Sequence, residues 1–195
     1  MQSSLIVANN FYSNPLVVRE KGLDYFRRGE QDIIPISSRT IHKLEQLVGT
    51  RITKIHNSDK NYPNNGAFFH QKKSDGFVLK VHHDFGAHQY IALVYLTPDA
   101  PADAGTSFWQ HKKTSIRTVV TPSDAERLEK NMDELHDMLE QDAPYRHRWK
   151  EIDRVGNQFN RIVLFNACYL HSATRVFGKN LETGRLTQYF NFSTL

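Results

Sequence analysis

The chain has 195 residues, of which 39% are hydrophobic and 11% aromatic, and it carries a formal net charge of +4. Twelve Phe and eight Tyr favour a folded globular protein over a disordered one, and the length predicts one domain over residues 1–195. The single cysteine, Cys168, excludes a disulfide framework and a cysteine-based zinc site.

The positive charge is scattered along the chain. Its densest run is YRHRWK at residues 145–150, and such a cluster is usually solvated surface, so a nucleic-acid partner is not expected. The N-terminus lacks the basic start and long apolar run of a signal peptide, and no window approaches the roughly 20 apolar residues of a membrane span. We therefore expect a cytoplasmic protein without a membrane partner.

The first third of the chain predicts two short elements and a loop. The run SLIVANNF near the N-terminus has the composition of a strand, and a turn is expected at Asn14-Pro15. Residues 38–49 predict a helix that Ser38 caps and Gly49 ends, because the apolar residues between them share one face. Residues 57–66 are rich in Asn and predict a loop.

From residue 76 onward the sequence predicts mainly strands. Five strand-like runs are GFVLKVHHDF, HQYIALVYLTP, GTSFWQH, NRIVLFNACYLHS and RLTQYFNF. One helix interrupts them at 123–141, where Ser123 and Glu126 are expected to form a capping box and Pro144 follows the end. Its apolar residues form a narrow stripe, which is typical of a helix packed on a surface.

Many short strands with one or two covering helices indicate a β-sandwich or barrel. We therefore predict a mainly β, jelly-roll fold with a few flanking helices. Its core is expected at about residues 76–193, and residues 1–75 supply N-terminal flanking elements. An α+β sheet with helices on one side is the alternative.

The run VHHDF at residues 81–85 places ionisable side chains between apolar neighbours. Because side chains alternate along a strand, His82 and Asp84 point to one face and His83 to the other. Two neighbouring ligands of one metal ion need such an arrangement. The His-x-Asp pattern alone is not specific, so a metal site requires a third ligand.

A third ligand is available where the apolar run NRIVLFNACYLHS ends in His171. A histidine there can also simply hydrogen-bond at the surface, and other histidines near strand ends compete with it, His111 most strongly. Further on, Arg185 opens the run RLTQYFNF with Thr187 on the same face. A guanidinium beside a hydroxyl can bind a carboxylate, although a strand-edge Arg often makes only a surface ion pair.

Together, VHHDF, LFNACYLHSA and GRLTQYFNF resemble the 2-oxoglutarate/Fe(II)-dependent oxygenases over roughly residues 76–193. GTSFWQHKKT resembles a small, largely uncharacterised branch with prolyl-hydroxylase-like architecture. The resemblance implies a double-stranded β-helix in which His82, Asp84 and His171 bind Fe(II) and form the catalytic centre. It also implies that Arg185 binds the distal carboxylate of the cosubstrate 2-oxoglutarate, with Thr187 as a second contact.

The resemblance further implies hydroxylation of an unidentified small-molecule, amino-acid or peptide substrate, with formation of succinate and CO₂. Two histidines and one carboxylate leave positions on iron open, which this chemistry requires. The stretch from His171 to Arg185 is longer than is usual in the family, and Arg175 lies nearer the usual spacing as an alternative anchor. Residues 57–75 and the helix at 123–141 are candidate lids.

Two other functions remain open at this point. The first is a jelly roll that binds a ligand or partner without catalysis. The second is a zinc-dependent hydrolase, because two histidines and an aspartate can also hold zinc. A role for Arg185 toward a cosubstrate separates the oxygenase from both.

Overall fold

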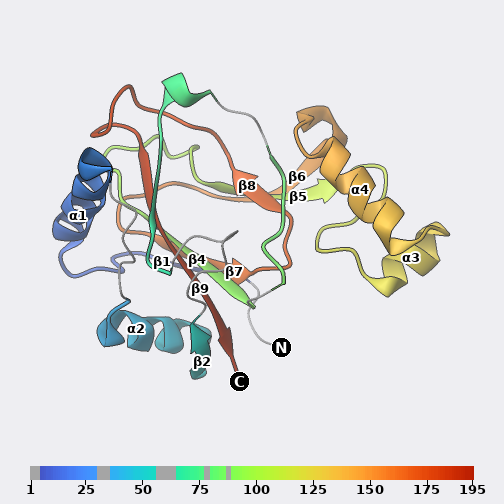
Figure 1. The fold of residues 1–195 in the computed structure, drawn as a ribbon, viewed down its shortest axis with the longest axis horizontal. Helices are drawn as coiled ribbons and strands as arrows, with labels where there is room; N and C mark the ends of the chain where they lie inside the picture. Colours follow the sequence, from blue (N-terminus) through green and yellow to red (C-terminus); the bar gives the residue numbers. More distant parts are fainter. Residues whose placement is uncertain (1–4, 30–35, 56–64, 77–79, 87–88) are drawn as a thin grey trace.

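The computed structural model describes residues 5–29, 36–55, 65–76, 80–86 and 89–195. Two antiparallel sheets face each other, and helices lie on their outer sides (Figure 1). The larger sheet has the strand order β1-β7-β4-β9-β2, with β3 also paired to β9, and the smaller sheet has the order β6-β5-β8. The elements are β1 (Leu5–Ala8), α1 (Pro15–Arg28), α2 (Ser38–Val48), β2 (Ile52–Ile55), β3 (Phe68–Gln71), a 3₁₀ turn (Lys73–Asp75), β4 (Tyr90–Tyr95), β5 (Thr106–His111), α3 (Pro122–Leu128), α4 (Met132–Asp142), a second 3₁₀ turn (Arg146–Arg148), β6 (Trp149–Val155), β7 (Ile162–Asn166), β8 (His171–Ala173) and β9 (Arg185–Thr194).

The space between the two sheets is filled by alternate side chains of the facing strands. Ile91 and Tyr95 of β4 and Phe165 of β7 pack there against Phe108 of β5 and Val155 of β6. The alternate residues of β4, Ala92 and Val94, point to the outer face of the larger sheet, as period-two alternation requires. The predicted mainly β, jelly-roll architecture is therefore confirmed.

Helices α1 and α2 cover the outer face of the larger sheet (Figure 1). Leu23 of α1 and Leu44 of α2 are buried there against strand residues such as Leu164. Helix α1 approaches β3 closely at Gly22, where an added Cβ would lie 2.8 Å from the ring of Phe68. A glycine at this position allows the helix backbone to approach the sheet.

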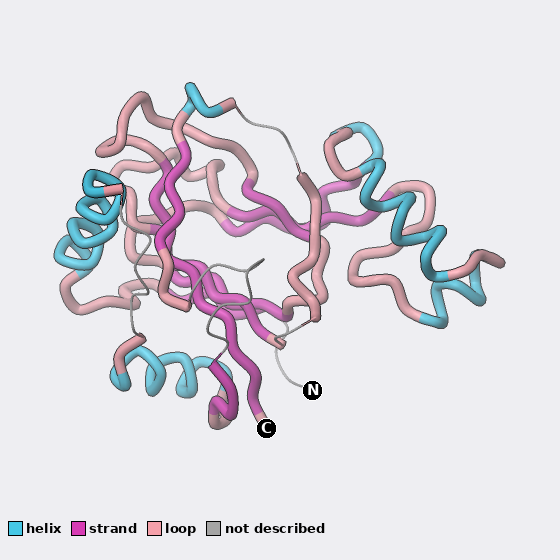
Figure 2. Tube along the Cα trace, in the orientation of Figure 1, coloured by secondary structure: helices cyan, strands magenta, loops and turns pink. Residues whose placement is uncertain are grey.

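Helices α3 and α4 form a unit on the outer face of the smaller sheet, at the right in Figure 2. Leu135 and Leu139 of α4 are buried against Trp109 of β5 and Trp149 of β6. The run YRHRWK is therefore more than the solvated surface that its charge predicts, because Trp149 is fully buried and begins a strand.

The N-terminal region differs from its prediction in three ways. Asn14-Pro15 is not a simple turn but the start of α1, because proline suits the first helical position, where its missing N–H costs nothing. Ser37, not Ser38, caps α2 and accepts a hydrogen bond from the Thr40 N–H at 3.1 Å. Strands β2 and β3 were not predicted, and β3 lies within the segment 57–75 that was considered as a lid.

The helix predicted at 123–141 is two helices, α3 and α4. Glu129 adopts a left-handed conformation with φ of 52°, which ends α3, and Asn131 then caps α4 by accepting from the Glu134 N–H at 2.7 Å. The capping box at the start of α3 is formed by Thr121 and Asp124 rather than by Ser123 and Glu126.

Two of the predicted strands also differ from their predictions. The run NRIVLFNACYLHS divides into β7, in the larger sheet, and β8, in the smaller one. The side chain of Asn166 accepts a hydrogen bond from the Cys168 N–H at 3.0 Å, which stabilises the turn between them. In GFVLKVHHDF, residues 77–79 lie outside the described residues, and the remainder is an extended segment with an isolated bridge at His82.

Replacing Thr121 by Ala is expected to destabilise the protein by about 0.5–2 kcal/mol, because the N-cap bond to the Asp124 N–H is lost. The matched change Ser123→Ala should alter the free energy of unfolding by less than about 0.5 kcal/mol. Urea unfolding followed by circular dichroism measures both values. A larger loss for Ser123→Ala than for Thr121→Ala would contradict the observed cap.

Candidate metal centre

His82 and His171 lie opposite each other on two short extended segments. Each backbone N–H donates to the carbonyl of the other residue, at 3.0 Å from His82 and 2.8 Å from His171. Directly opposed residues of an antiparallel pair project their side chains to the same face. The two imidazole rings accordingly lie side by side, with centroids 4.5 Å apart.

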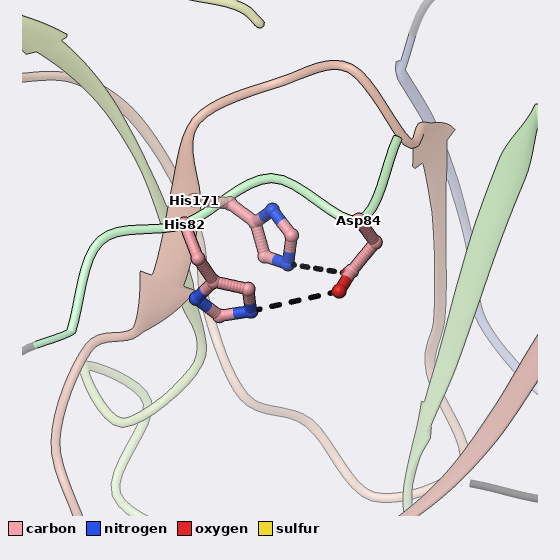
Figure 3. Close-up of side chains that lie close together, drawn as sticks. All are labelled: His82, Asp84 and His171. Carbon is pink, nitrogen blue, oxygen red and sulfur yellow. Dashed lines mark ion pairs between the residues drawn. The ribbon is translucent and has the colours of Figure 1, made fainter. Parts of the chain in front are cut away.

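Asp84 completes the group from the same segment as His82 (Figure 3). Its backbone N–H donates to the carbonyl of Ala167 at 2.9 Å, which fixes the segment at the end of β7. Its carboxylate oxygens lie 3.9 Å from Nε2 of His82 and 3.3 Å from Nε2 of His171. One donor atom from each residue lies within 4.8 Å of the other two, so the three side chains could hold one metal ion.

The hydrogen bonds of the two imidazoles determine which nitrogen is available to a metal. Nδ1 of His82 lies 2.9 Å from the carbonyl of Lys80, and Nδ1 of His171 lies 2.9 Å from that of Tyr169. A carbonyl only accepts, so each Nδ1 carries a proton, and Nε2, which faces Asp84, is the nitrogen available to a metal. Metal-binding histidines typically have such an outer partner, and the donor set therefore fits a divalent metal.

The protonation of His82 supports the same reading. Desolvation, with a smaller contribution from the neighbouring His171, lowers the pKa of His82 to about 4, although Asp84 opposes the shift. The ring is therefore neutral at pH 7, which is the form that binds a metal. The two backbone carbonyls that orient the rings, of Lys80 and Tyr169, were not predicted, because a backbone acceptor leaves no mark in the sequence.

The competing histidines lie elsewhere. His83 points away from the group, as predicted, and its ring lies 5.9 Å from that of His136 on α4. His111 is fully buried and bridges Thr114 and Asp142, at 2.9 and 3.0 Å. His111 thus ties β5 to the end of α4 and does not join His82, Asp84 and His171.

Arg185 lies between the two sheets, at the start of β9. It is only 6% exposed, and burial lowers the pKa of its guanidinium. Its Nη2 donates a long hydrogen bond of 3.5 Å to the carbonyl of Gly105, and its Nε has no hydrogen-bond partner among the described residues. A buried cation with unused donors has the properties of an anion-binding group.

The rival Arg175 has a different environment. Its Nη2 forms an ion pair with Asp103 at 2.5 Å, and both side chains are about half exposed, at 42% and 57%. Thr187 is buried and two residues from Arg185 on β9, so both face the space between the sheets. Arg185 and Thr187 therefore lie inside the fold, whereas Arg175 is paired with Asp103 near the surface.

Strand β5 relates Arg185 to the three clustered side chains. The guanidinium bonds to Gly105, just before β5, whereas Phe108 on β5 is paired with His171. Gly105 and Phe108 are three residues apart, which at about 3.3 Å per strand residue corresponds to about 10 Å along β5. The rings of Phe165 and His171 are in contact with centroids 4.6 Å apart, and Phe165, Phe108 and Tyr95 belong to one interior cluster.

Comparison with solved structures shows a shared fold. The chain aligns with apo HygX from Streptomyces hygroscopicus at a TM-score of 0.50 and 16% identity, covering 98% of this chain and 82% of HygX. HygX with nickel and 2-oxoglutarate bound aligns at 0.49 and 15%, covering 98% and 83%. A prolyl-4-hydroxylase from Pseudomonas putida aligns at 0.47 and 11%, covering 97% and 86%. The resemblance to the oxygenases is thus confirmed at the level of the fold.

Three further findings concern membrane-spanning helices and matches to known sequences. None of the helices in the described part of the chain has the length and apolar character that a membrane crossing needs. A search of curated proteins finds no significant match. A family model does match residues 80–192, a stretch that includes His82, Asp84, His171 and Arg185. This match covers more than half of the length of the chain, and the chain therefore belongs to the family of unknown function DUF6445.

Proposed function

We propose that the protein is an Fe(II)- and 2-oxoglutarate-dependent oxygenase that hydroxylates a small-molecule, amino-acid or peptide substrate. The observation that carries the proposal is the group formed by His82, Asp84 and His171, with both Nε2 atoms directed toward the carboxylate. Two histidines and one carboxylate are typical of non-haem iron oxygenases. A shared fold with HygX, which has been crystallised with iron bound and with nickel and 2-oxoglutarate bound, supports the choice of metal and cosubstrate.

In this proposal, the three clustered side chains bind the iron. Asp84 supplies the negative charge, and the carbonyls of Lys80 and Tyr169 keep both imidazoles in the tautomer that offers Nε2. When bound, iron and 2-oxoglutarate together supply dioxygen activation, with succinate and CO₂ as products. The chain's own contribution is to hold the ligands on one side so that other positions stay open.

Arg185 and Thr187 are proposed to bind the cosubstrate. The buried guanidinium has donors free for both oxygens of a carboxylate, and the hydroxyl of Thr187 lies on the same face. The residues that neighbour Arg185 and His171 lie about 10 Å apart along β5. This separation suits a dicarboxylate that has one end at the metal and the other at the guanidinium. Burial strengthens this contact, because water does not compete for the charged groups.

The alternatives explain less of the site. A zinc-dependent hydrolase would use the same three ligands but would leave a buried arginine without a role. A non-catalytic jelly roll would account for neither the clustered ligands nor the unused donors of Arg185. The oxygenase proposal accounts for both features.

Replacing His171 by Ala is expected to weaken Fe(II) binding by at least about 10–100-fold, since even outer partners of a metal ligand have effects of this size. Anaerobic titration of the parent with Fe(II) and 2-oxoglutarate should produce a visible absorption band that requires both components and is lost in His171→Ala. His42→Ala, at an exposed histidine of α2, serves as the matched control. A band that persists in His171→Ala would contradict the metal assignment.

The change Arg185→Met should reduce 2-oxoglutarate affinity by about 30-fold or more, because a buried charged contact is typically worth 2–5 kcal/mol. It should not lower the free energy of unfolding of the cosubstrate-free protein, since an unpaired buried charge is removed. Isothermal titration of the metal-loaded protein and urea unfolding measure the two effects. Arg175→Met is the control, and equal losses of affinity in both variants would refute the proposed anchor.

A further inference from the structure

A cavity of about 300 Å³ lies on the outer face of the larger sheet. Its floor includes Phe68, Gln188 and Phe190, each at most 6% exposed. Gln188 and Phe190 alternate along β9 with Thr187 and Tyr189, which face the space between the sheets. The cavity is therefore separated from the metal centre by the sheet itself, and its volume is at the lower end of the range of small-molecule sites.

The floor of this cavity is held in place by buried hydrogen bonds. The hydroxyl of Tyr12 donates to Oε1 of Gln188 at 2.6 Å, and Nε2 of Gln188 donates to the carbonyl of Gly66 at 2.9 Å. The backbone of Tyr12 is bonded at both its N–H and its carbonyl to the side chain of Asn160, at 2.8 and 2.9 Å. These bonds preform the floor, which lowers the cost of ordering it around a ligand.

The walls of the cavity carry three cations. Lys21, Arg39 and Lys43 line it, and no Asp or Glu among the described residues does. Among the described residues, none of the three makes an ion pair: Arg39 donates to the Ser13 hydroxyl at 3.3 Å, and Lys43 contacts the carbonyl of Phe11 and lies 5.5 Å from its ring centroid. The positive charge in this cavity is therefore not neutralised by the described part of the chain.

The N-termini of two helices add to the positive charge of the cavity. Asn14, which precedes α1, and Ser37, which precedes α2, both line the cavity. Acidic residues are favoured in the first turn of a helix, yet neither helix has one, and α2 has Arg39 there instead. A charge placed against the local preference suggests a functional rather than a structural role.

We propose that this cavity binds a small amphipathic anion, namely a carboxylate or phosphate monoester attached to a short apolar body. The anionic head would lie against Lys21, Arg39 and Lys43, and the apolar body would cover Val18 and Phe68, which also line the cavity. Charge-assisted hydrogen bonds would fix the head, and burial of apolar surface would add affinity. This site does not depend on the proposed oxygenase activity, because it shares no residue with the metal centre.

Isothermal titration of the full chain with octanoate and with octyl phosphate tests the proposal and distinguishes the two head groups. Saturable 1:1 binding of either probe is expected, together with an affinity at least about tenfold lower in the double variant Lys21→Gln/Arg39→Gln. Lys43 is left unchanged because it also contacts the Phe11 carbonyl. The matched control Lys112→Gln/Lys113→Gln removes two exposed cations beyond β5 and should bind like the parent.

Four results would contradict the proposal. The first is no saturable binding of either probe by a parent that circular dichroism shows to be folded. The second is an equal affinity in the double variant and the parent. The third is loss of binding in Arg185→Met, which would place the anion between the sheets. Inorganic phosphate should bind more weakly than octyl phosphate, and equal binding would refute the apolar part of the site.

Discussion

The reciprocal backbone pairing of His82 with His171 is the constraint on which the candidate site depends. It joins a short extended segment to β8 through two hydrogen bonds, and so places two imidazoles 89 positions apart in sequence on the same face. The chain needs no long strand to do this, since one opposed pair sets the register. Asp84, two residues along the same segment, then falls on that face by alternation, and its own N–H is held by Ala167.

The same alternation organises the interior of the fold. Each strand of the larger sheet sends one set of side chains toward the smaller sheet and the other toward α1 and α2. Arg185 belongs to the inward set of β9, where a charge is costly unless a ligand or partner compensates it. Gln188, on the outward set, lines the cavity on the other face of the sheet. One strand thus places Arg185 and Gln188 on opposite faces of the larger sheet.

The sequence contained enough information for the apolar strands β4, β5, β7 and β9, the three clustered side chains and the placement of Arg185, because these follow from period-two alternation along apolar runs. It was less informative where local chemistry has several solutions. Thr121 and Ser123 are both residue types that cap helices well, and only the folded backbone determines that Thr121 is the N-cap. The role of His111 was also hidden, because its partner Asp142 is distant in sequence. Strand β6 was missed because its charged neighbours concealed the buried Trp149.

A crystal structure of the protein with Mn(II) in place of Fe(II), and with a non-reactive analogue of 2-oxoglutarate, tests the central claim most directly. The account predicts one metal ion bound by Nε2 of His82, Nε2 of His171 and a carboxylate oxygen of Asp84, with the analogue extending from the metal to the guanidinium of Arg185. A metal bound through Nδ1, a metal held by other residues, or an analogue that does not reach Arg185 would contradict it.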